Sequence, residues 1–223
     1  MGALVAIEGI DGAGKGTQAA RVAATAGTRG HSVTSFSFPL YDGNPFSRAV
    51  ADYLNGEFGS ADDVHPELAG LLYAGDRFHA RPRLLEALER SDLVVCDRYV
   101  ASNAAHQGAK LRGEARARLL DWLEEVEYGE FALPRPELVV LLDAPVALAR
   151  ELVGRKAARG YTTLEADIHE ADAGHSRATR EVYLELAGRQ GWRIVPTADA
   201  DGAPRGVDEI ADEVWSAVEP LLR

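Results

Sequence analysis

A glycine-rich turn near the start of the chain constrains the fold more than any other feature. Residues 6–17 read Ala-Ile-Glu-Gly-Ile-Asp-Gly-Ala-Gly-Lys-Gly-Thr, so an apolar run leads directly into glycines and a lysine. The segment that begins at Gln18 is rich in alanine and predicts a helix, which places the turn at a strand-to-helix corner. At such a corner, successive backbone N–H groups and the helix N-terminus form a cradle for a polyphosphate.

This turn predicts a site for the phosphates of a nucleotide such as ATP. The Lys15 side chain would reach the β- and γ-phosphates as a point charge, and the glycines let the backbone curl around them. The alternative is a glycine-rich turn with an incidental lysine. The residues expected to bind ATP are Gly9, Ile10, Asp11, Gly12, Ala13, Gly14, Lys15, Gly16 and Thr17.

The residue after the lysine departs from the usual pattern of such turns. A hydroxyl that ligates Mg²⁺ normally stands there, whereas this chain has Gly16 and carries the hydroxyl one residue later, at Thr17. We therefore expect Mg²⁺ to be held through water at this point.

Composition limits the class of protein and its partners. With 223 residues, of which 46% are hydrophobic, the chain has the size of one globular domain over 1–223, with an inserted lid. A net charge of −11 argues against DNA or RNA as the main partner, because nucleic-acid surfaces are usually basic.

Cysteine usage and hydropathy indicate a cytoplasmic protein. The single cysteine, Cys96, lies in an apolar run, which predicts a buried structural thiol and gives no sign of an oxidising compartment. No basic and apolar leader precedes the first strand, and no stretch approaches about eighteen consecutive apolar residues, so we expect no membrane partner.

Alternating apolar runs and helical patterns predict an α/β fold of the P-loop NTPase type, with three layers and a five-stranded parallel sheet between helices. The expected strands are Ala3–Ile7, Val33–Phe38, Leu93–Cys96, Leu138–Leu142 and Trp192–Val195. The expected helices cover about 15–27, 66–89, 114–128, 145–157, 169–190 and 207–222. Ligands of such sheets gather at the carboxyl ends of the strands.

Asp97 and Arg98 follow the third expected strand, at the same edge as the glycine turn. An acid at this place in a P-loop protein organises Mg²⁺, and an arginine forks onto phosphate oxygens. A local Asp–Arg pair that closes the strand is the alternative. The candidate metal-binding residues of the whole chain are Asp97, Thr17, Asp11 and Glu170.

Two further segments carry candidate binding groups. Tyr73 and Arg77 are four residues apart on an expected helix and share a face, so a ring could stack on a base while the guanidinium donates to its carbonyl. A core tyrosine beside a solvated arginine is the commoner arrangement. Arg155 and Arg159 end another helix and predict a basic lid over about 154–168, with a solvated helix end as the alternative.

Together these pieces resemble the thymidylate kinase family, whose members move the ATP γ-phosphoryl group to thymidine monophosphate. The resemblance spans nearly the whole chain. It rests on residues 7–15, Phe38-Pro39, 73–77, Asp97-Arg98-Tyr99, Ser102-Asn103, Gln107-Gly108, the arginines of 155–159 and residues 167–170.

The resemblance implies roles for individual residues. Asp11 would contact the sugar hydroxyl or phosphate of the acceptor, and Arg98 would bridge the donor and acceptor phosphates. Tyr73 would stack on thymine and Arg77 would bind its O4. The implied catalytic residues are Lys15, Asp11, Arg98, Arg155 and Arg159, and the implied substrate-binding residues are Asp11, Phe38, Pro39, Tyr73, Arg77, Arg98, Asn103, His106 and Gln107.

The same resemblance implies MgATP and dTMP as ligands, a homodimer, and a transition state stabilised from the lid. His106 stands where the family often has tyrosine or phenylalanine near the sugar, so we expect this chain to reject ribonucleotides less sharply. Two rivals are an adenylate-kinase-like enzyme, favoured by Gly16-Thr17-Gln18, and a P-loop binding module without catalysis. The Asp97-Arg98 pair and the basic lid would place charge on both sides of the γ-phosphate. Binding alone does not need this, so it argues against the second rival.

Overall fold

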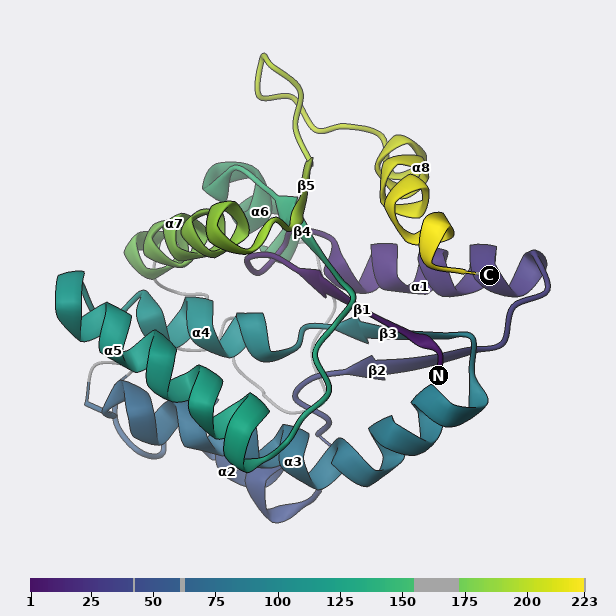
Figure 1. The fold of residues 1–223 in the computed structure, drawn as a ribbon. Helices are drawn as coiled ribbons and strands as arrows, with labels where there is room; N and C mark the ends of the chain where they lie inside the picture. Colours follow the sequence, from purple (N-terminus) through teal and green to yellow (C-terminus); the bar gives the residue numbers. More distant parts are fainter. Residues whose placement is uncertain (42, 61–62, 155–172, 223) are drawn as a thin grey trace.

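The fold is a central parallel sheet between two layers of helices, which confirms the predicted α/β class (Figure 1). The computed structural model describes residues 1–41, 43–60, 63–154 and 173–222. Five parallel strands have the order β2-β3-β1-β4-β5. In chain order the elements are β1 (Ala3–Glu8), α1 (Lys15–Thr28), β2 (Val33–Ser37), α2 (Pro45–Leu54), α3 (Pro66–Arg90), β3 (Leu93–Asp97), α4 (Val100–Gly108), α5 (Gly113–Glu124), a π-helical segment (Glu125–Glu130), β4 (Leu138–Asp143), α6 (Val146–Gly154), α7 (Ala173–Gln190), β5 (Arg193–Pro196), α8 (Val207–Val218) and a 3₁₀ turn (Glu219–Leu221).

Alternation along the strands divides the core into two layers. Val5 and Ile7 of β1 pack on the side of α1, α7 and α8, whereas Leu4 and Ala6 pack on the side of α3. Both sets are buried because successive side chains of a strand point to opposite faces of the sheet. Cys96 on β3 is also fully buried, as predicted, and burial raises the pKa of its thiol.

Several elements differ from the sequence prediction. Helices α2 and α4 were not expected, although α2 carries clear start signals: Asn44 caps it by accepting from Phe46 N and Ser47 N, and Pro45 is its first residue. Helix α4 was missed because Ser102, Asn103 and Gln107 are buried in it beside small apolar residues, so it has no clear apolar periodicity. The helix expected over 114–128 stays α-helical only to Glu124 and then widens into π-helix.

The first strand delivers the glycine turn to the carboxyl edge of the sheet. β1 ends at Glu8, and α1 begins at Lys15. Gly9, Gly12 and Gly14 have positive φ angles of 148°, 86° and 92°, which only glycine adopts readily. The turn therefore lies beside the end of β3, which pairs with β1 along its whole length.

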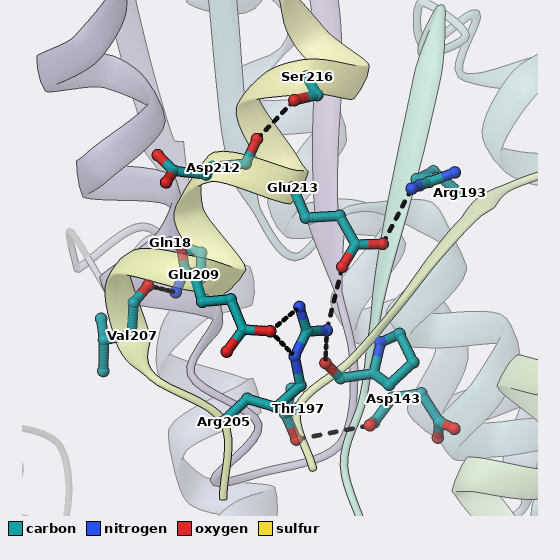
Figure 2. A network of polar contacts seen from close by, with 11 residues as sticks. Gln18, Asp143, Arg193, Thr197, Arg205, Val207, Glu209, Asp212, Glu213 and Ser216 are labelled. Atoms are coloured by element: carbon teal, nitrogen blue, oxygen red, sulfur yellow. Dashed lines mark hydrogen bonds and ion pairs between the residues drawn. The ribbon is translucent and has the colours of Figure 1, made fainter. Parts of the chain in front are cut away.

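The loop after β5 is fixed at the same edge by a network of charges, which Figure 2 shows. The Arg205 guanidinium donates to Pro196 O at 2.7 Å and to the carboxylates of Glu209 and Glu213 on α8. Gln18 of α1 donates to Val207 O at 3.1 Å, which ties the helix of the glycine turn to the start of α8. These contacts hold α1, α8 and the β5 loop together.

Across the described ranges, no helix has the length and apolar composition that a membrane span needs.

We expect Gly12→Ala to destabilise the protein far more than Gly14→Ala. Both residues have left-handed φ angles, which cost an alanine about 1–2 kcal/mol. A Cβ on Gly12 would also lie 1.9 Å from Ala149 O of α6, whereas a Cβ on Gly14 meets nothing within 4 Å. The crowding adds about 1–3 kcal/mol for Gly12→Ala alone.

Urea unfolding of both variants without nucleotide measures the two costs. Equal losses would show that α6 gives way and does not clamp the turn.

Candidate active site

A cavity of about 270 Å³ opens at the carboxyl edge of the sheet, where β1, β2 and β3 end. It brings together most of the residues that the sequence singled out. The predicted residues that line it are Asp11, Gly12, Gly14, Lys15, Gly16, Phe38, Pro39, Tyr73, Arg77, Asp97, Arg98, Asn103, His106 and Gln107.

Other predicted residues lie elsewhere. Gly9, Ile10 and Ala13 are buried behind the cavity wall, and Thr17 is exposed on the first turn of α1 and does not line the cavity. The lid expected over about 154–168 falls outside the described residues apart from Gly154, and so do Arg155, Arg159 and Glu170.

Lys15 is a buried cation at the floor of this cavity. Its side chain is 7% exposed, and its Nζ donates to Ile10 O at 2.7 Å and lies 4.0 Å from the Asp11 carboxylate. Burial, with the nearby charge of Arg98, lowers the pKa of Lys15 to about 8. Burial thus disfavours the charged form of Lys15, and an anionic ligand in the cavity would stabilise it.

Arg98 lines the same cavity, and its side chain contacts three other residues there. Its guanidinium donates to Asp11 Oδ1 and, at 3.1 Å, to the Ser102 hydroxyl, and it lies 3.4 Å from His106 Nε2. Burial alone would lower the pKa of Arg98, but the carboxylates of Asp11, Asp97 and Glu8 hold it above its ordinary value. Lys15 and Arg98 thus share Asp11 as a common counter-ion.

A fully buried carboxylate, Glu8, holds the groups around Arg98 in place. Its Oε1 accepts from Tyr99 N at 2.7 Å, and its Oε2 accepts from the hydroxyls of Ser102 and Tyr183 at 2.6 and 2.9 Å. Burial raises the pKa of Glu8, while these hydrogen bonds and the charge of Arg98 act against that rise. Sequence reasoning did not single out Glu8 or Tyr183, because their partners lie far away along the chain.

The end of β3 offers a place for Mg²⁺. Asp97 Oδ1 is buried and has no hydrogen-bond partner among the described residues, and a carboxylate oxygen is a preferred Mg²⁺ ligand. Its Oδ2 lies 2.9 Å from where a Cβ on Gly16 would be. The Asp97 carboxylate therefore takes the space that a hydroxyl side chain after the lysine would use, and it fits the role predicted for it.

The far end of the cavity is lined by buried amides. Gln107 is fully buried, and neither atom of its amide has a partner within the described ranges; the same holds for Asn103 Oδ1. Buried polar atoms without partners are rare in folded proteins. Here they line a cavity, so they indicate a polar ligand.

Arg77 lies beside these amides in a buried ion pair. Its Nε and Nη2 donate to the two carboxylate oxygens of Glu127 at 2.5 and 2.7 Å, with 3% and 0% of the two side chains exposed. The solvated arginine considered as an alternative from the sequence is therefore wrong. Glu127 lies in the π-helical segment and was missed, because no pattern marks an acid that a widened helix turns inward.

Aromatic rings form the remaining walls. Phe38 is buried between Phe36 and Tyr99, with ring centroids about 6 Å away on either side. Tyr73 is half-buried and meets Tyr53 edge to face at 6.3 Å. Asp76 fixes the neighbouring loop by accepting from Leu40 N and Asn44 Nδ2. A flat ligand would therefore lie between rings, with amides and a guanidinium at its edge.

Comparison with known proteins identifies the family of this chain. The thymidylate kinase family model matches residues 7–201. The thymidylate kinase of Mycobacterium tuberculosis is 36% identical over 202 residues, covering 89% of this chain and 92% of that protein. The Deinococcus radiodurans thymidylate kinase is 35% identical over 98% of this chain and 97% of its own length.

A solved structure supports the fold. The Candida albicans thymidylate kinase superposes with a TM-score of 0.74 at 21% identity, covering 98% of this chain and 92% of that one. The family match extends over most of the chain and includes the end of β1, the glycine turn, β3 and the residues that line the cavity. The chain therefore belongs to the thymidylate kinase family.

Proposed function

We propose that the cavity at the carboxyl edge carries out the family's reaction, transfer of the γ-phosphoryl group of ATP to the phosphate of dTMP. This activity, an ATP:dTMP phosphotransferase, follows from membership in the family. One observation supports its location: Lys15, Arg98 and the buried amides of Asn103 and Gln107 all line one cavity. In this proposal Lys15 and Arg98 bind the phosphates, and Asn103 and Gln107 contact the base.

The donor phosphates lie in the glycine turn in this proposal. The N-terminus of α1 and the backbone around Gly12 and Gly14 bind them, and the buried Lys15 neutralises the β- and γ-oxygens. No covalent intermediate with the protein is needed. Alignment of two phosphates and stabilisation of developing charge supply the catalysis.

Arg98 bridges the two phosphates from the other side. Anionic phosphates that enter the cavity compete with Asp11 for Lys15 and Arg98. The Asp11 carboxylate can then contact the acceptor nucleotide. Mg²⁺, when bound, would neutralise negative charge on the donor oxygens, and Asp97 with Asp11 would hold it. That Thr17 and Glu170 also bind Mg²⁺ stays a prediction. Arg155 and Arg159 are proposed to add charge to the transition state from a lid.

The nucleoside occupies the far end of the cavity. Tyr73 and the Phe38-Pro39 segment flank the base, Arg77 donates to its O4, and Asn103 with Gln107 contacts the remaining polar edge. His106 lies next to the sugar. The adenylate-kinase-like rival does not fit the family match, and Gln18, which favoured it, serves to bind Val207 O.

We expect Lys15→Ala to abolish phosphoryl transfer and leave dTMP binding largely intact, because this lysine serves the donor phosphates. A coupled assay with dTMP, dUMP, dCMP, AMP and GMP establishes the activity and its acceptor, and calorimetry measures dTMP binding. Arg21→Ala is the control, since Arg21 pairs with Asp208 on the outer side of α1. Near-normal turnover by Lys15→Ala would contradict the phosphate-cradle assignment.

His106→Tyr should sharpen the rejection of ribonucleotides. His106 lines the cavity beside Arg98 and packs edge-on against Tyr183, and a phenol there fills more of the space next to the sugar. Steric rejection of one hydroxyl is limited to about 1–3 kcal/mol. The measurement is kcat/KM for dTMP and its ribose analogue in both proteins; equal ratios would mean that another residue reads the sugar.

The chain is also proposed to act as a homodimer, as the family resemblance implies, and in the cytoplasm, as its sequence predicts. Leu68, Leu71 and Phe78 form an exposed apolar stripe along α3. The exposed ring of Phe46 on α2 lies against the backbone of Gly75 within the same stripe. This apolar face would be covered in a pair of chains.

Leu71→Glu should convert the dimer to a monomer in sedimentation equilibrium, because it places a charge in the centre of the apolar face. Val207→Glu, at an exposed apolar residue on α8, is the control and should leave the mass unchanged. A Leu71→Glu protein that stays dimeric would remove this face from the proposal.

A further inference from the structure

Three buried side chains from separate elements meet behind the base end of the cavity. Glu127, in the π-helical segment, accepts from Arg77 of α3 at 2.5 and 2.7 Å. The same carboxylate accepts from Asn103 Nδ2 of α4 at 2.8 Å. Arg77 and Asn103 line the cavity, whereas Glu127 does not.

Every group that the Glu127 carboxylate meets here is a hydrogen-bond donor. They are Nε and Nη2 of Arg77 and Nδ2 of Asn103. An ionised carboxylate only accepts, so it satisfies all three. A glutamine in its place would turn an N–H toward one of these donors in either orientation of its amide. The site therefore demands an acid and not merely a side chain of this size.

Glu127 also fixes which way the Asn103 amide faces. Asn103 Nδ2 donates to Gly70 O at 2.9 Å as well as to Glu127, so two acceptors hold the nitrogen. The oxygen of the amide must then face the other way. That atom, Asn103 Oδ1, is buried and has no partner among the described residues. Because Asn103 lines the cavity, the atom that its amide leaves available to a base bound there is an acceptor.

Arg77 is fixed in the same manner. Its bidentate bond to Glu127 uses two of the five N–H donors of a guanidinium and sets the plane of the fork. Burial alone would lower the pKa of Arg77, but the charge of Glu127 reverses this and keeps the group above its ordinary value. The remaining N–H groups of Arg77 can thus donate to a ligand in the cavity, next to the acceptor at Asn103.

This pair of groups distinguishes the polar edges of pyrimidines. Thymine and uracil present an N3–H donor beside the O4 acceptor, which complements Asn103 Oδ1 and Arg77. Cytosine presents the reverse, an N3 acceptor beside an N4–H₂ donor, and would meet like groups at both places. We infer that Glu127, which contacts no substrate, is the positioning residue that sets the choice of a 4-oxo pyrimidine by holding both readers; this rests on the function proposed above.

A purely structural role for Glu127 explains these contacts less well than a role in recognition does. Replacing a buried ion pair with apolar groups is often neutral or stabilising, so stability gives little reason to keep one. Two observations point to recognition: Glu127 also holds Asn103, and the Asn103 oxygen, on a residue that lines the cavity, has no partner among the described residues. The two accounts differ in one measurable quantity, the ratio of activities on different bases.

The test compares kcat/KM for dTMP, dUMP and dCMP in the wild-type chain and Glu127→Gln. The ratio of dTMP to dCMP should fall by about ten- to a hundredfold in the variant, the range for loss of a charge-assisted hydrogen bond. Most of the change should lie in the KM for dTMP. The ratio of dTMP to dUMP should not move, because these bases share the N3–H and O4 edge and differ only in a methyl group.

These ratios do not depend on how much of the variant is folded, so partial unfolding does not obscure the result. Glu127→Asp keeps an acceptor-only carboxylate and should retain more of the dTMP to dCMP ratio than Glu127→Gln does. Glu124→Gln is the matched control, since that exposed acid pairs only with Arg135 among the described residues, and it should behave as wild type.

An unchanged dTMP to dCMP ratio in Glu127→Gln overturns the inference. Where Glu127→Gln has no activity, the ratio of the dissociation constants for dTMP and dCMP, measured by calorimetry, takes the place of kcat/KM, and an unchanged ratio overturns the inference in the same way. A parallel fall in all three activities, without a change in ratio, would make Glu127 structural and overturns it too. Failure of the wild-type chain to phosphorylate dTMP would instead refute the proposed function.

Discussion

The site depends on one arrangement of charge, in which buried carboxylates hold cations at the end of two adjacent parallel strands. β1 supplies Glu8 and β3 leads into Arg98, and their pairing places these groups together. Asp11 then stands between Arg98 and Lys15. Two cations in one small cavity repel each other, so the carboxylates are what allow both to remain there before any phosphate binds.

One short helix joins the two groups of buried contacts. In α4, Ser102 contacts Glu8 and Arg98, and its neighbour Asn103 contacts Glu127. If the site works as proposed, α4 sets the distance between the groups that bind phosphate and the groups that read the base. Polar residues on the buried face of this helix, Ser102, Asn103 and Gln107, then serve the cavity and not the core.

Local signals in the sequence predicted the sheet, the glycine turn and many of the residues that line the cavity. The roles of Phe38, Pro39 and His106 came only from the family resemblance, and Tyr41 and Leu54 were not predicted. Such signals work for Lys15 and Arg98 because a strand end or a strand-to-helix corner marks them. They fail for Glu8 and Glu127, whose meaning comes from partners 94 and 50 residues away. A buried acid looks like a surface acid until the contacts that neutralise it are known, and Glu127 is turned inward by a π-helix that no pattern indicates.

The backbone at Arg98 shows how such long-range contacts offset local strain. Arg98 has a φ angle of 67°, in the left-handed region that a long side chain rarely adopts. Its own N–H donates to Ile7 O at 3.0 Å, and the next N–H, of Tyr99, donates to Glu8 at 2.7 Å. Strand β1 thus holds both peptide groups of the turn. Strain of this kind persists only where surrounding structure enforces it, and here the result is a guanidinium directed back across the glycine turn to Asp11.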